Sequence, residues 1–90
     1  MNIIRVVIYR SAKSGGWLAQ GCERDICVQA PTLKELYERF RVTVEMETAA
    51  GNLTLISPAP AEFSKMWDEC AGIAGPVDKF DNNLLYRMAG

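Results

Sequence analysis

The chain has 90 residues, of which 49% are hydrophobic and 23% are charged, with ten basic and eleven acidic side chains. Length and composition favour a single globular domain over residues 1–90 with a modest core, and they argue against a disordered chain. The net charge of −1 disfavours direct nucleic-acid binding, because phosphate recognition normally requires a dense basic stripe, whereas the basic residues here are scattered from Arg5 to Arg87.

The N-terminus lacks the basic region and apolar run of a signal peptide, and no apolar stretch approaches the roughly 20 residues that a membrane span needs. Three cysteines, an odd number, are typical of a reducing compartment. We therefore expect a cytoplasmic protein without membrane contact, in which Cys22, Cys27 and Cys70 are free thiols. No metal site is expected, since the chain has no histidine and the cysteine spacings are not those of a zinc ligand set.

The first thirty residues predict three strands. Residues 3–10 are rich in β-branched and apolar side chains, and both of their faces are at least half apolar, as in a strand that lies inside a sheet. The pair Gly15-Gly16 predicts a tight turn, followed by strands over residues 17–22 and 26–30. Because the connections are short, these strands are expected to form an antiparallel meander.

A helix is predicted after Pro31. Thr32 and Glu35 form a capping box, in which the hydroxyl and the carboxylate each accept a backbone N–H at the helix start. The helix should end at residues 50–52, which contain a glycine. Its opposite face alternates acidic and basic residues and is expected to be solvated. The apolar face recurs at a spacing of three and four and comprises Leu33, Leu36, Tyr37, Phe40 and Val44.

The remaining chain predicts a short fourth strand over residues 53–56 and a second helix over about residues 61–71, which repeats the apolar spacing. The tail leaves two alternatives open. Residues 77–80 and 84–88 could form a hairpin, or Asp81 could cap a last helical turn. The fold class expected is therefore α+β, a small antiparallel sheet in the order β-β-β-α-β followed by a second helix.

The residue types argue against catalysis. The absence of histidine excludes Ser-His and Cys-His nucleophile pairs and removes the commonest general base. Neither a GxxxxGK[ST] nor a GxGxxG pattern is present, so no phosphate-binding loop is expected. The acidic residues fall mostly in turns and on the charged helix face. We expect neither an enzyme nor a cofactor.

Residues 3–56 resemble the HicB-like antitoxin fold, a partial ribonuclease-H-like sheet with one helix. The resemblance is carried by the segments 16–20 and 25–36, in which Thr32, Leu33 and Glu35 match the family's Thr-Leu-x-Glu junction between strand and helix. The chain departs from the family where Ala30-Pro31 replaces a glycine. Residues 57–90, an expected helical or irregular extension, do not resemble the family's DNA-binding segments.

The resemblance implies a homo-oligomer, such as a homodimer, that binds a small ribonuclease toxin. Together with the lack of catalytic residues, it predicts a non-catalytic protein-binding module, antitoxin-like or an inhibitor of another effector. Because Trp and Met are enriched at interface centres, we expect the second helix to contact the partner or to complete the core. The expected partner-binding residues are Trp67, Met66, Phe63, Trp17 and Tyr9.

The alternative is a nucleic-acid-binding module. Arg5, Tyr9 and Trp17 would then form an aromatic platform on one sheet face, on which bases stack at roughly 1–3 kcal/mol each.

Overall fold

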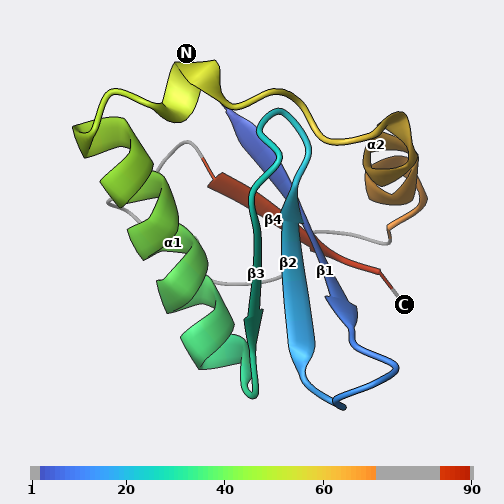
Figure 1. The fold of residues 1–90 in the computed structure, drawn as a ribbon. Coiled ribbons are helices and arrows are strands. Elements are labelled where there is room, and N and C mark those ends of the chain that lie inside the picture. The colour runs from blue at the N-terminus through green and yellow to red at the C-terminus, as the bar shows by residue number, and fades with distance from the viewer. Residues whose placement is uncertain (1–2, 71–83, 90) are drawn as a thin grey trace.

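A computed structural model describes residues 3–70 and 84–89. In these residues a four-stranded sheet lies between two helices, α1 on one face and α2 on the other (Figure 1). No helix in the described ranges is both long and apolar enough to cross a membrane. In chain order the elements are β1 (Ile4–Arg10), β2 (Trp17–Gly21), β3 (Cys27–Ala30), α1 (Leu33–Ala49), a 3-10 helix η1 (Leu53–Leu55), α2 (Ala61–Glu69) and β4 (Leu84–Met88).

The sheet has the strand order β3-β2-β1-β4. The predicted meander is confirmed, because β1–β2 and β2–β3 are both antiparallel. The turn between β1 and β2 contains Gly15, whose φ of 71° confirms the expected need for glycine. The sheet is mixed rather than antiparallel, since β4 pairs with β1 in parallel. Residues 84–88 therefore form a strand whose partner is β1; residues 77–80, the partner of the hairpin alternative, and Asp81 lie outside the described ranges.

The predicted strand at residues 53–56 is wrong. Leu53 begins the 3-10 helix η1, and both Leu53 and Ile56 pack against the main core, whereas Leu55 is 77% exposed. Residues three apart share a side of a helical turn but lie on opposite faces of a strand. The burial of Leu53 and Ile56 together therefore favours the turn over the strand.

The start of α1 agrees with the capping prediction in part. The Thr32 hydroxyl accepts the backbone N–H of Glu35 at 3.2 Å. The Glu35 carboxylate, instead of returning to Thr32, lies 3.5 Å from the Arg39 guanidinium. A second ion pair, Arg41–Glu45, forms further along the same helix at 3.1 Å. Both ion pairs lie at i,i+4 on exposed helix surface and are worth a few tenths of a kcal/mol each.

The apolar face of α1 packs over β2 and β3 and closes the main core. Leu36 and Phe40 are fully buried and Val44 nearly so, while Tyr37 is half-buried. Tyr37 and Phe40 meet the ring of Tyr86 edge to face, at centroid distances of 4.9 and 6.4 Å. The predicted burial of this helix face is confirmed, and β4 contributes a ring to it that the helix pattern alone did not indicate.

We predict that Phe40→Ala destabilises the fold by about 3–5 kcal/mol, because the ring is fully buried and its removal leaves a cavity. Met46→Ala is the matched control, since the Met46 side chain is 66% exposed on the same helix, and it should change stability by no more than about 0.5 kcal/mol. Urea unfolding followed by circular dichroism measures both variants. Equal unfolding midpoints would contradict the packing of α1 on the sheet.

Candidate protein-interaction surfaces

Arg5 of β1 forms an ion pair with Glu23, in the turn between β2 and β3, and a hydrogen bond with α2. The Arg5 backbone N–H donates to Glu23 Oε1 at 2.6 Å, and Arg5 Nε donates to Glu23 Oε2 at 2.5 Å. Arg5 Nη2 donates to Ser64 Oγ of α2 at 3.1 Å. The hydrogen bond that Arg5 donates to the Glu23 carboxylate raises the pKa of Arg5. Each side chain is about one third exposed (31% and 35%), so the pair contributes no more than about 1 kcal/mol. The pair holds the Arg5 guanidinium in place, from which it donates to Ser64 of α2.

Four of the five predicted partner-binding residues come together on the α2 side of the sheet. Trp67 packs with buried Val7 and Cys22, and half-buried Tyr9, Phe63 and Met66 surround this cluster. Trp67 is only 7% exposed. The Arg87 guanidinium lies 4.4 Å from its ring centroid, and Arg87 Nη1 donates to the Trp67 carbonyl at 3.2 Å. The indole ring therefore completes a second core, and a role at a protein contact stays a prediction.

Trp17 lies apart from the other four. It pairs with Arg10 in the β1–β2 ladder, packs against the main core on the α1 side, and has the Arg10 guanidinium 4.6 Å from its ring centroid. Tyr9, the neighbour of Arg10 in β1, faces the α2 side. The expected platform of Arg5, Tyr9 and Trp17 on one sheet face is wrong, because successive strand residues point to opposite faces.

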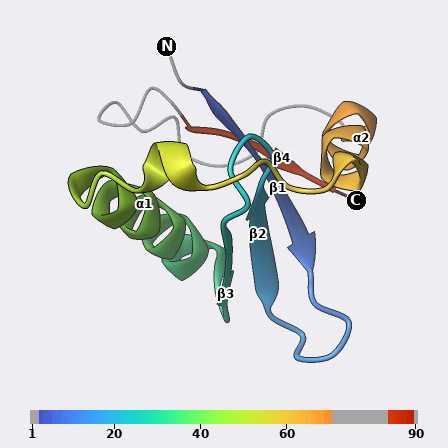
Figure 2. The ribbon, with the colours of Figure 1, turned by 45° about the horizontal axis from the view of Figure 1, so that its top comes forward.

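α2 covers only part of its sheet face. It packs on β1, and Figure 2 shows it beside β1 and β4 rather than over β2 and β3. Four side chains of β1, β2 and β3 form the uncovered part, which we call the open sheet face: Tyr9, Leu18, Cys27 and Gln29. The first two are half-buried and the last two are exposed. None of the four carries a formal charge at neutral pH.

Acidic groups border the open sheet face. Burial raises the pKa of Tyr9, and the Cys27 thiol and the Glu62 carboxylate add to the shift. Neighbouring atoms partly shield the sulfur of the exposed Cys27 from water, and this desolvation raises the pKa of its thiol, with a further contribution from Asp25. Asp25 lies beside the face, because its Oδ1 accepts a hydrogen bond at 2.8 Å from Gln20, the residue that pairs with Cys27. An apolar, uncharged surface with an acidic border binds a protein more readily than a polyanion.

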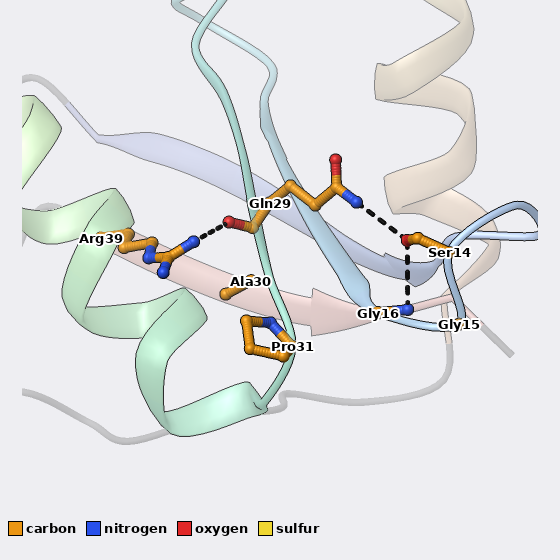
Figure 3. A pocket seen from close by; sticks show the side chains of 7 residues that line it. All are labelled: Ser14, Gly15, Gly16, Gln29, Ala30, Pro31 and Arg39. Carbon is orange, nitrogen blue, oxygen red and sulfur yellow. Dashed lines mark hydrogen bonds between the residues drawn. The ribbon is translucent and has the colours of Figure 1, made fainter.

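β3 is an edge strand, and two hollows line its open side. Figure 3 shows the first, of about 460 Å³, where Gln29 Nε2 donates to Ser14 Oγ at 2.8 Å and Arg39 Nη1 donates to the Gln29 carbonyl at 2.6 Å. The second, of about 400 Å³, also includes Arg39. Together they form what we call the edge groove, whose second hollow is lined by Val28, Glu38, Arg39, Val42 and Thr43.

The sequence analysis did not predict the edge groove. Two apolar residues, Val42 (43% exposed) and Met46 (66% exposed), interrupt the charged face of α1 at a spacing of four. That spacing places both side chains on one stripe of the helix, and this stripe was the feature of the sequence that could have indicated the groove. The stripe becomes part of a groove only because α1 packs beside the β3 edge, where Val42 and Val28 line the same hollow.

The described ranges contain no cluster of three or more residues able to hold a metal ion. In comparisons with known proteins, no protein-family model, no curated protein and no solved structure matches the chain.

We predict that Trp67→Ala destabilises the fold by about 3–5 kcal/mol, because the ring is buried in the second core. Lys65→Ala is the control on the same helix, since Lys65 is exposed. Urea unfolding compares them. A Trp67→Ala variant with unchanged stability that no longer self-associates or binds its partner would instead place the ring at a contact between proteins.

Thiol reactivity provides a further prediction. All three cysteines are free, and Cys27 is exposed whereas Cys22 is 3% exposed. Cys27 should react first with a thiol reagent, and its rate should continue to rise above the usual thiol pKa, because its own pKa is raised and the thiolate is the nucleophile. Stopped-flow labelling of wild type and Cys27→Ser tests this. A fast phase that survives the substitution would contradict it.

Proposed function

We propose that the chain is a non-catalytic protein-binding module, of the antitoxin or inhibitor kind, whose partner contacts the open sheet face. The observation that carries this proposal is the incomplete cover of the sheet: α2 packs on β1 and leaves Leu18, Cys27 and Gln29 accessible. A half-buried apolar patch beside exposed neutral side chains is typical of a surface that a partner completes.

The acidic border supports a partner with a basic surface. Asp25 accepts a hydrogen bond from Gln20, which pairs with Cys27, and Glu62 of α2 adds to the raised pKa of Tyr9, so both carboxylates lie near the face. An enzyme that cleaves RNA has to attract phosphates and therefore presents basic residues around its active site. A ribonuclease toxin would accordingly be steered to this face and would lose access to RNA once bound.

The sequence resemblance to HicB-like antitoxins supports the same proposal. Three strands and a helix follow one another in residues 4–49, in the order that the resemblance implies. The segment at residues 53–56 departs from it. The family assignment therefore rests on the segments 16–20 and 25–36 and remains part of the proposal.

Tagged chain purified from its native host tests the proposal. We predict that wild-type bait retains a basic protein and that Leu18→Lys weakens its capture at least about tenfold, because the new charge must be buried against a basic surface. Lys34→Ala, an exposed change at the start of α1, is the control and should capture the partner as wild type does.

The function of the captured protein separates an inhibitor from a scaffold. If the proposal is correct, that protein cleaves RNA on its own and stops when the wild-type chain is added in equimolar amount. A partner bound equally by wild type and Leu18→Lys would overturn the location of the site. Binding of an oligonucleotide by the chain itself at low salt, with no protein partner, would support the nucleic-acid alternative.

A further inference from the structure

The backbone of β3 offers a hydrogen-bonding edge. Gly21 donates to the Ile26 carbonyl at 2.8 Å, which places residues 26, 28 and 30 at the hydrogen-bonded positions of the β2–β3 ladder. The backbone groups of Cys27 and Gln29 therefore point away from β2. The Arg39 guanidinium donates a hydrogen bond to the Gln29 carbonyl. The backbone N–H groups of Cys27 and Gln29 have no hydrogen-bond partner within residues 3–70 and 84–89.

A second copy of this edge would satisfy those groups. If two β3 strands meet antiparallel about a two-fold axis at Val28, Cys27 of each copy lies opposite Gln29 of the other. Each such pair can exchange two backbone hydrogen bonds, with Arg39 releasing the Gln29 carbonyl. Val28 then faces Val28 of the other copy as a non-hydrogen-bonded pair, in which side chains lie closest.

The edge grooves of two copies related by this two-fold axis are complementary to each other. Val28 and Val42 line its second hollow, so the two apolar walls would meet across the axis. That hollow also contains one acidic and one basic side chain, Glu38 and Arg39. A two-fold axis beside the hollow brings Glu38 of one copy toward Arg39 of the other, and does so twice. An isologous contact requires this kind of self-complementarity.

We propose that the chain forms a homodimer through its β3 edges, with Val28 on the two-fold axis and Glu38 opposite Arg39 of the other copy. The dimer follows from the edge and its charges, whereas its consequence rests on the proposed function. Joining the sheets makes the two open sheet faces continuous over the strands β2-β3-β3-β2. Three strand spacings give a floor roughly 15 Å wide between the two α2 helices, wide enough for one helix or hairpin of a partner.

A charge exchange tests the dimer. Arg39→Glu leaves two acids in each groove and Glu38→Arg leaves two bases, so each variant alone should be monomeric in sedimentation velocity. An equimolar mixture pairs acid with base at both contacts and should restore a species of twice the 10.0 kDa chain mass. Because each chain in the mixture carries only one of the two substitutions, the rescue must come from contact between the chains and not from compensation inside one chain.

Two further variants complete the experiment. Lys13→Glu makes the same change of charge in the exposed β1–β2 turn and should dimerise as wild type does. Cys27→Pro removes an N–H that points away from β2, so it should abolish the dimer and keep the circular dichroism spectrum of the fold. A wild type that is monomeric at about 200 μM, a mixture that stays monomeric, or a dimeric Cys27→Pro would each overturn the proposal.

The experiments distinguish failure of the proposed dimer from failure of the proposed function. A chain that dimerises but captures no basic partner retains the β3 contact and loses the proposed function. A monomeric chain that captures a basic partner through Leu18 retains the proposed function and loses the β3 contact.

Discussion

Val6, Val7 and Ile8 are fully buried because β1 is covered on both faces, by α1 on one side and by α2 on the other. Such a strand must lie inside the sheet, since burial on both faces leaves its backbone groups no access to water. β2 satisfies one edge of β1 and β4 the other. The inner position of β1, between β2 and β4, follows from this burial.

The two helices cover the sheet unequally. α1 extends over β2 and β3, but α2 has only nine residues and reaches β1. One half of a sheet face and the β3 edge are therefore not covered by the helices in residues 3–70. The open sheet face carries side chains without formal charge, whereas the edge groove contains one acidic and one basic side chain, Glu38 and Arg39.

The local features of the first fifty residues were predictable from sequence because short-range physics determines them. The alternation in residues 3–10, the paired glycines and the Thr32 cap each act within a few residues. The spacing of Leu36 and Phe40 likewise indicates one buried helix face wherever the sheet lies. Of the expected interaction residues, Tyr9, Phe63, Met66 and Trp67 do gather on one side, because α2 was correctly predicted as an amphipathic helix.

Sequence alone thus determined the α+β class, the meander, both helices and the absence of histidine chemistry. Tertiary structure decided which of two apolar segments became the fourth strand, since residues 53–56 and 84–88 both have strand-like composition and only the free edge of β1 selects between them. It also separated Trp17 from Tyr9 and placed Val42 beside Val28. These outcomes depend on strand register and on contacts between distant segments, which no local pattern encodes.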